Sequence, residues 1–147
     1  HLVLRRQRQM CIRDRLDFQS FPMAEATKAV NDATLTVLML ETPTAIRNAN
    51  DIASVEGVDC LLIGTNDLCM EMGIPGELDH PEIMEAYKQT ITACKKHGKF
   101  VGMGGVYNFN AMRVYIDMGV QLVLAGNDLS FMISAGREQT NKLRSLA

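Results

Sequence analysis

The sequence predicts an α/β protein in which four parallel strands alternate with helices. Four short apolar runs recur along the chain, at residues 35–40, 58–63, 99–103 and 121–125, and a helix-forming segment follows each of them. The runs lack regular polar alternation, which is typical of strands buried on both faces of a parallel sheet. No hairpin signal joins any two of them. Two architectures fit: an open doubly wound sheet, or half of an eight-stranded (β/α)8 barrel, the TIM barrel.

Two helices are expected in the first third of the chain, one on each side of the first strand. Residues 22–32 are rich in alanine and start with Pro22, and proline is favoured in the first turn of a helix. Residues 42–54 start with Thr42-Pro43 in the same way, and Gly57 ends this helix.

The longest helix is expected after the second strand and a loop of about a dozen residues. It starts near Pro81, with Asp79 or His80 as its cap. It ends at residues 95–98, where two lysines, a histidine and a glycine complement the helix dipole. Two further helices are expected, at residues 110–118 and 128–144.

Composition narrows the class of protein. The 147 residues suffice for one domain, and the net charge of −2 with interspersed signs indicates neither a nucleic acid nor an acidic membrane as partner. No apolar run approaches the roughly 20 residues of a membrane-spanning helix. The four cysteines lack paired spacing, which argues against zinc or a disulfide framework and favours a cytoplasmic location.

Residues 1–15 differ from the rest of the chain. They combine a short apolar patch with a basic cluster, in the wrong order for a targeting peptide and without the aromatic residues of a nucleic-acid-binding arm. The Met-Cys-Ile-Arg-Asp string at residues 10–14 resembles one translated frame of a sequencing adaptor. We therefore expect residues 1–15 to be non-native and residues 16–147 to form the folded domain.

Two acidic residues follow two of the predicted strands. Glu41 closes the run of residues 37–40, and Asp67 stands just beyond the run that leads to Gly64. In neighbouring parallel strands, the right-handed crossover puts both carboxylates at the same edge of the sheet. Converging carboxylates repel each other unless a proton or a cation intervenes, so the pair is a candidate site for a hard divalent metal. Helix capping is the alternative for each, and the better explanation for Asp128 after the fourth strand.

Other candidate residues carry weaker signals. Gly104 and Gly105 end the third predicted strand, where glycines allow a ligand to approach the backbone, although a tight turn explains them almost as well. His80 and His97 stand at the two ends of one predicted helix and give little indication of catalysis. The sequence contains no Gly-x-Gly-x-x-Gly motif, which argues against a dinucleotide site.

Several motifs together point to one protein family. They are Leu-Met-Leu-Glu-Thr at 38–42, Val-Glu-Gly-Val-Asp at 55–59, Ile-Gly-Thr-Asn-Asp-Leu at 63–68, Asp-His-Pro-Glu at 79–82 and Val-Leu-Ala-Gly-Asn-Asp at 123–128. With them the chain resembles the HpcH/HpaI aldolase family from about residue 18 onward. The resemblance implies a metal-dependent class II aldolase with a TIM barrel, which joins pyruvate and an aldehyde or releases them. It also implies that residues 16–147 are a partial barrel domain, the C-terminal half with about four β-α units.

The resemblance gives the two acids one shared role. In the family, a strand-end Glu and a loop Asp hold a divalent cation (Mg²⁺, Mn²⁺ or Co²⁺), and these positions are Glu41 and Asp67 here. The cation chelates the carboxylate and keto oxygens of pyruvate and stabilises the enolate as it forms. The substrate-binding residues implied by the resemblance are Gly64, Thr65, Asn66, Gly104 and Gly105.

The resemblance also implies what this sequence lacks. The family's general-base His and pyruvate-binding Arg lie on earlier strands, so no catalytic residue is identified here and the fragment alone is expected to be nearly inactive. Two positions depart from the family pattern: Met39 replaces a frequent Gln, and Thr65-Asn66 replaces the commoner Pro-Ala. The full-length protein is expected to be a homo-oligomer in which the last helix packs on a neighbour.

Two rival functions stay open. The citrate lyase β or malyl-CoA lyase branch shares the metal-binding acids but acts on acyl-CoA thioesters. A non-catalytic module, in which glycine loops hold a small carboxylate and the acids merely cap helices, also fits the residues. In the preferred interpretation the partners are a 2-oxo acid and an aldehyde.

Overall fold

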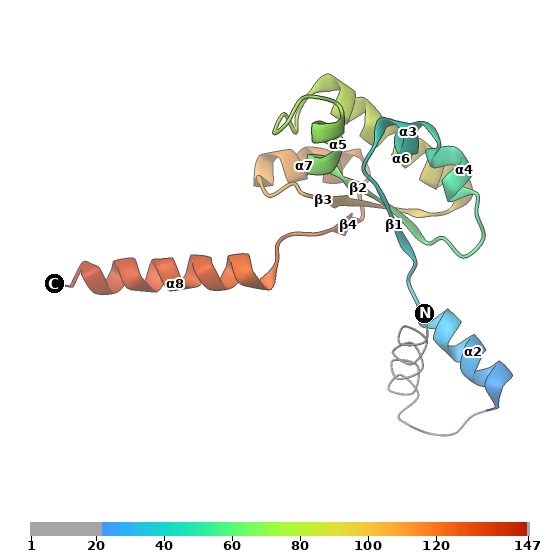
Figure 1. The fold of residues 1–147 in the computed structure, drawn as a ribbon, viewed down its shortest axis with the longest axis horizontal. Helices are drawn as coiled ribbons and strands as arrows, with labels where there is room; N and C mark the ends of the chain where they lie inside the picture. The colour runs from blue at the N-terminus through green and yellow to red at the C-terminus, as the bar shows by residue number, and fades with distance from the viewer. Residues whose placement is uncertain (1–21, 147) are drawn as a thin grey trace. The chain divides into compact units, whose positions relative to one another are not determined.

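The computed structural model describes residues 22–146 of the chain (Figure 1). The segment expected to be non-native, residues 1–15, lies outside the described residues. The chain divides into two compact units, His1–Leu35 and Thr36–Ala147. The described part of the first unit contains helix α2 (Met23–Asp32), so the prediction of a helix at residues 22–32 is confirmed. No residue of α2 is buried.

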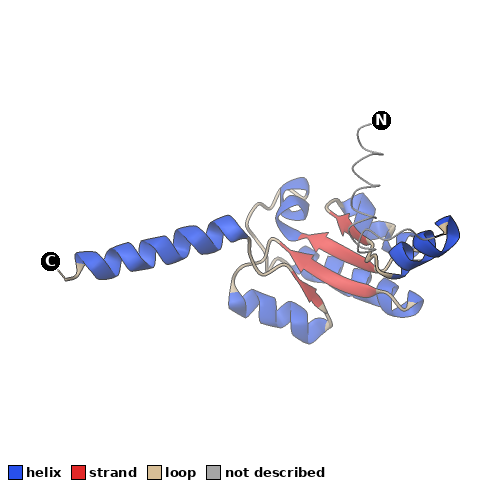
Figure 2. Ribbon diagram, turned by 90° about the horizontal axis from the view of Figure 1, so that it is seen from below, coloured by secondary structure: helices blue, strands red, loops and turns tan. Residues whose placement is uncertain are grey.

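The second unit is built on a four-stranded parallel sheet (Figure 2). Its strands, hydrogen-bonded in chain order, are β1 (Val37–Leu40), β2 (Cys60–Gly64), β3 (Phe100–Gly104) and β4 (Leu122–Val123). The register places Leu40 beside Ile63, Ile63 beside Met103, and Met103 beside Val123. Strand order does not reverse among these four strands, whereas it reverses at the switch point of a doubly wound sheet. The prediction of a parallel α/β fold is confirmed.

Helices occupy the connections between the strands and gather over one face of the sheet (Figure 1). They are α3 (Pro43–Arg47), α4 (Ala49–Ala53), α5 (Thr65–Glu71), α6 (Pro81–His97) and α7 (Phe109–Met118). Side-chain caps begin three of them, including α6, described below. The Thr42 hydroxyl accepts from the backbone N–H of Ala45 in α3, and the Asn108 side chain accepts from the backbone N–H groups of Asn110 and Ala111 in α7. Such caps fix where each helix leaves its strand.

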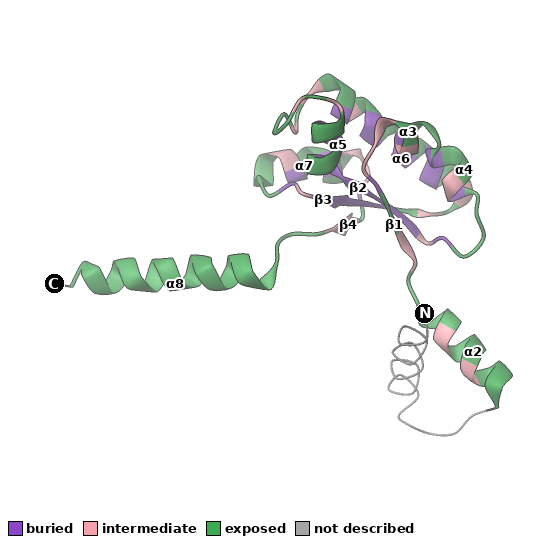
Figure 3. Cartoon of the chain, in the orientation of Figure 1, coloured by how far each residue is buried: buried purple, intermediate pink, exposed green. Residues whose placement is uncertain are grey.

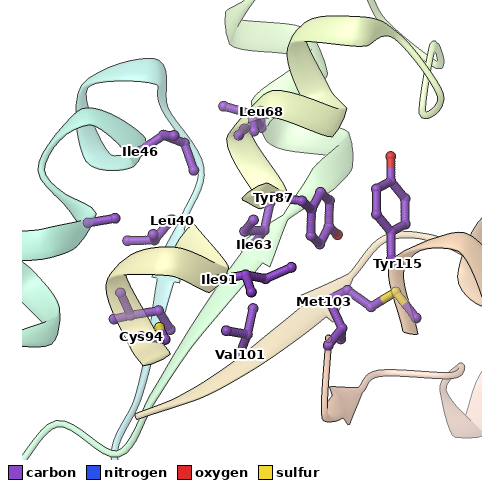
Figure 4. Close-up of a cluster of buried hydrophobic side chains, with 14 of the residues drawn as sticks. Leu40, Ile46, Ile63, Leu68, Tyr87, Ile91, Cys94, Val101, Met103 and Tyr115 are labelled. Carbon is purple, nitrogen blue, oxygen red and sulfur yellow. The ribbon is translucent and has the colours of Figure 1, made fainter. Parts of the chain in front are cut away.

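The hydrophobic core lies between the sheet and these helices (Figure 4). Along α6, Ile83, Tyr87, Ile91 and Cys94 recur at helical spacing and are buried. Alternate residues of the strands belong to the same cluster, namely Leu40, Leu61, Ile63, Val101 and Met103. Because burying one such side chain contributes about 1.5–3 kcal/mol, this cluster holds the strand ends in a fixed register.

The first strand is less buried than expected. In β1, Leu38 is 37% exposed and Met39 is 53% exposed, so the prediction of burial on both faces is wrong for this strand (Figure 3). The reason is its place at the edge of the described sheet, with one strand neighbour instead of two. Strand β2 has neighbours on both sides and is buried throughout, as the sequence predicts.

Two connections also differ from the sequence prediction. The helix expected at residues 42–54 is split in two, because Asn48 has φ −91° and ψ 5° and both ends α3 and begins α4. The loop expected after the second strand begins with the helix α5, whose N-cap is Gly64. The cap of α6 is His80, whose Nδ1 accepts from the backbone N–H of Glu82 at 3.3 Å.

The C-terminal elements are β4 and helix α8 (Asp128–Arg144). Strand β4 has two residues where the sequence predicts five, residues 121–125. Helix α8 has its predicted bounds, and none of its residues is buried (Figure 3). Among the helices at residues 22–146, none is long and apolar enough to cross a membrane.

Candidate metal and substrate site at the carboxyl edge of the sheet

The ends of the first three strands meet at one edge of the sheet. Leu40, the last residue of β1, pairs with Ile63, so Glu41 comes beside Gly64. Gly64 in turn pairs with Gly104 at the end of β3. The register therefore gathers the predicted site residues of three separate segments at one place, as parallel strand order requires.

The side chain of Glu41 lies across the end of β2. A Cβ atom placed on Gly64 would come within 2.8 Å of the Glu41 Cγ and 3.1 Å of its Oε1. Real Cβ atoms do not approach other atoms so closely, so the glutamate occupies its position only because residue 64 has no side chain. Gly64 thus contributes by leaving space for the Glu41 carboxylate.

Neither of the two acids caps a helix. Thr42, not Glu41, caps α3, and α5 starts at Gly64 without any side-chain cap although Asp67 lies in its first turn. Glu41 is half-buried and Asp67 is exposed. Within residues 22–146, neither carboxylate has a hydrogen bond or an ion pair, so both have oxygen atoms available for a ligand.

Asp128 shows the contrast. It follows the fourth strand as Asp67 follows the second, but its Oδ1 accepts a hydrogen bond of 2.8 Å from the backbone N–H of Leu129. The N-cap of α8 is the preceding residue, Asn127, whose side chain accepts from the N–H of Ser130 at 2.8 Å. Asp128 therefore lies in the first turn of α8, and the prediction that it caps this helix is wrong by one residue, because the cap is Asn127.

The loop after β3 lies against the first turn of α5. A Cβ atom on Gly105 would come within 3.0 Å of the Asn66 Nδ2 and 3.1 Å of the Asn66 backbone nitrogen, and Gly105 has a φ of +80°. Gly104 is buried, and its nearest side-chain neighbours are Leu62 and Leu124. These two glycines therefore serve close packing at the sheet edge, with Asn66 on one side and apolar groups on the other.

Thr65 faces away from this edge, into the helix layer. Its hydroxyl is 2.7 Å from the hydroxyl of Tyr87 in α6, and both side chains are fully buried. The Tyr87 ring stacks on Tyr115 of α7 with ring centres 3.9 Å apart, and the Tyr115 hydroxyl donates to the backbone carbonyl of Leu78. Burial raises the pKa of Tyr87, so its hydroxyl stays protonated and can donate. Sequence reasoning missed this network; its signal is a tyrosine on the apolar stripe of α6.

The two carboxylates fit a hard divalent cation as a partial ligand set. Mg²⁺ prefers oxygen ligands, is often held by only one or two carboxylates, and keeps several water or substrate oxygens. Within the described residues, no group of three or more His, Cys, Asp and Glu side chains could enclose a metal ion. Two hollows of about 410 and 210 Å³ lie on the helix layer, and neither is lined by Glu41 or Asp67. Among these four residue types, Glu41 and Asp67 therefore form a partial ligand set rather than a complete cage.

Comparisons with known proteins all point to one protein family. A sequence model described as HpcH/HpaI aldolase/citrate lyase matches residues 6–135. The 4-hydroxy-4-methyl-2-oxoglutarate aldolase tasA of Hapsidospora irregularis is 31% identical over 116 residues, covering 78% of this chain and 43% of the relative. The 4-hydroxy-2-oxo-heptane-1,7-dioate aldolase of Escherichia coli is 33% identical over 105 residues, 71% of this chain and 40% of the relative. The chain thus spans about two fifths of the length of these relatives.

The fold has a counterpart among solved structures. The HpcH/HpaI aldolase from Desulfitobacterium hafniense superimposes with a TM-score of 0.76 at 24% sequence identity, covering 90% of this chain and 51% of that one. At this identity the similarity supports the fold, while the sequence matches support the family. The chain, whose curated relatives are aldolases, therefore belongs to the HpcH/HpaI aldolase/citrate lyase family.

Proposed function

We propose that this chain supplies the metal-binding half of a class II aldolase site. The complete protein would cleave 4-hydroxy-2-oxo acids into pyruvate and an aldehyde, or form them from these two compounds. The supporting observation is the pair Glu41 and Asp67, two carboxylates that share one sheet edge, cap no helix and have no protein partner among the described residues. The substrate class is supported by the two relatives named above, because each name contains a 4-hydroxy-2-oxo acid.

We also propose that β1 to β4 are four of the eight strands of a (β/α)8 barrel. Their unbroken chain order in the sheet supports this, as does the 51% coverage of the Desulfitobacterium hafniense aldolase chain. In such a barrel the helices cover the outside, and the opposite sheet face, which carries Met39 and Leu124, looks inward. Both of these side chains are about half exposed, which fits an inward face that would be packed by side chains of the other four strands of the barrel.

Each residue at the edge has a distinct proposed task. Glu41 and Asp67 would hold the cation, which supplies a Lewis acid for the 2-oxo acid when it is bound. Asn66, at the start of α5 and against Gly105, borders the space beside the acids and can hydrogen-bond a substrate carboxylate. Gly64 leaves room for the Glu41 carboxylate, and Gly104 lets the end of β3 pack closely against Leu62 and Leu124. Thr65 contributes through its backbone because its hydroxyl is used by Tyr87.

Acid–base chemistry is proposed to come from elsewhere in the complete barrel. The two described histidines are used at helix ends: His80 caps α6, and the Nε2 of His97 lies 3.1 Å from the Oδ1 of Asn50. Neither is left free beside the acids to move a substrate proton. The chain alone is therefore expected to bind metal but to release pyruvate very slowly or not at all.

A metal titration tests the carboxylate pair. Free Mn²⁺ measured by electron paramagnetic resonance should fall on addition of the wild-type chain. Glu41→Gln and Asp67→Asn should each weaken Mn²⁺ binding by at least about tenfold, because each removes a charged oxygen ligand of a hard cation while keeping its shape.

Asp128→Asn is the matched control, since it neutralises an acid in the corresponding place after β4. Its Mn²⁺ affinity should equal that of the wild type. The proposal fails if the wild type binds no Mn²⁺, or if Asp128→Asn weakens binding as much as the other two variants do; such results would favour the non-catalytic module.

An activity assay tests the reaction class. The 147-residue chain and a full-length family enzyme are supplied with Mn²⁺ and 4-hydroxy-2-oxoheptane-1,7-dioate, and pyruvate release is followed. We expect release by the full-length enzyme and almost none by the chain. Full activity in the chain would contradict the proposal that it holds only half of the active site. Malyl-CoA serves as the second substrate, because thioester cleavage would indicate the citrate lyase branch that the family description also includes.

The complete protein is proposed to be a cytoplasmic homo-oligomer. Helix α8 supports the oligomer, because its exposed apolar side chains include Leu129, Phe131 and Met132 at 58–70% exposure. Apolar side chains clustered on an exposed helix are typical of a protein interface.

A further inference from the structure

We propose that Tyr87 is a positioning residue for the metal site: its hydroxyl holds Thr65, and Thr65 holds the first turn of α5, which carries Asp67. The inference rests on the proposed function only in its last step, where Asp67 is a metal ligand. The hydrogen bond and its effect on α5 stand independently of that step.

The contact is short, buried and close to the acid in sequence. The two hydroxyl oxygens are 2.7 Å apart, and both side chains are fully buried. Thr65 is the first residue of α5 and Asp67 is the third. Because a buried hydroxyl without a partner is costly, each hydroxyl keeps the other in place.

Helix α5 is short and lacks a cap, so it needs such an anchor. It has seven residues and no side-chain cap at its start. Isolated helices of this length are not stable in water, so its position depends on contacts made by its side chains. Leu68 and Cys69 supply apolar burial, which has no direction, whereas the Thr65 hydrogen bond fixes a specific rotation of the first turn.

The tyrosine stack provides an internal control. Tyr87 and Tyr115 form one stacked pair, but their hydroxyls bond different partners. The Tyr87 hydroxyl meets Thr65, whereas that of Tyr115 donates to the carbonyl of Leu78, in the turn between α5 and α6. Removing either hydroxyl leaves both rings in place, so a comparison separates anchoring of α5 from general loosening of the core.

Amide hydrogen exchange of the metal-free chain tests the anchoring. Tyr87→Phe and Thr65→Val should each speed exchange at the amides of Leu68 and Cys69 by about tenfold, because both remove the same hydrogen bond. The double variant should be no faster than either single variant. Thr65→Ser keeps the hydroxyl, so these two amides should exchange as slowly as in the wild type. Tyr115→Phe should also leave their exchange rates unchanged.

Mn²⁺ affinity of the same variants tests the consequence for Asp67. Tyr87→Phe and Thr65→Val should weaken binding by several-fold, while Thr65→Ser and Tyr115→Phe should match the wild type. The proposal fails if Tyr115→Phe speeds exchange in α5 as much as Tyr87→Phe does, or if exchange rises with Mn²⁺ affinity unchanged. A wild type that binds no Mn²⁺ would overturn the proposed function, and the exchange data would still decide whether Tyr87 anchors α5.

Discussion

At the scale of single residues, the site depends on small residues as much as on charged ones. Glu41 reaches over the end of β2 because Gly64 has no Cβ, and Gly105 brings its loop against Asn66 in the same way. A carboxylate that lies on backbone, with no protein partner among residues 22–146, can turn toward a ligand without first breaking an ion pair.

Gly64→Ala should therefore weaken metal binding although it replaces neither of the proposed metal-binding side chains. The new methyl group would lie 2.8 Å from the Glu41 Cγ, so the glutamate must move. We expect Mn²⁺ binding to weaken by about tenfold, in keeping with the 1–3 kcal/mol typical of overpacking. Isothermal titration calorimetry measures this. Gly136→Ala in α8 is the control, because a Cβ there meets no atom within 4 Å; equal affinities for the two variants would contradict the steric explanation.

At the scale of elements, α6 connects the core to the site. One side of it buries Ile91 and Cys94 against the sheet, and its Tyr87 reaches Thr65 at the start of α5. Burial raises the pKa of the Cys94 thiol to about 11, and the thiols of Cys60 and Cys69 are shifted in the same direction. The helix–sheet contact therefore requires neutral thiols.

This requirement predicts a loss of stability at alkaline pH. Below about pH 9, Cys94 is protonated in both the folded and the unfolded chain, so its full contribution to the free energy of unfolding is present. Between about pH 9 and 11 only the unfolded chain ionises at this thiol, so the free energy of unfolding falls as pH rises. Urea unfolding should show that the wild type loses about 2 kcal/mol more than Cys94→Ala over this range. Parallel pH curves for the two proteins would contradict the prediction.

At the scale of the whole molecule, the second unit leaves apolar surface uncovered. Within residues 22–146, strand β1 lies at the edge of the sheet with an exposed Met39, and α8 buries none of its residues. Open sheet edges and exposed apolar helix faces favour association between copies. The chain by itself is thus expected to self-associate.

Charge placed on α8 should reduce that association. The double variant Leu129→Lys/Met132→Lys puts two positive charges on positions three residues apart, which share one helix face. Light scattering coupled to size-exclusion chromatography should show a lower mean mass than for the wild type. Asn141→Lys adds charge at a polar position of the same helix and should leave the mass unchanged; a mass that does not respond to the double variant would place the contact elsewhere.

The sequence by itself determined the alternation of strands and helices, the parallel sheet, and the placement of Glu41 and Asp67 at one edge of it. These follow from local patterns: apolar runs of strand length, proline and glycine at helix ends, and the handedness of the crossover. The alternative of helix capping could also be stated in advance, but only the side-chain contacts showed that neither Glu41 nor Asp67 caps a helix.

Only the tertiary structure decided the contacts between distant segments. The pairing of Thr65 with Tyr87, the fit of Glu41 over Gly64 and the exposure of β1 each depend on residues at least 22 positions apart or on a missing neighbour. The break at Asn48 was also missed, since local propensity favours one continuous helix there. Sequence patterns report the preferences of single segments, whereas packing geometry depends on all the segments that meet.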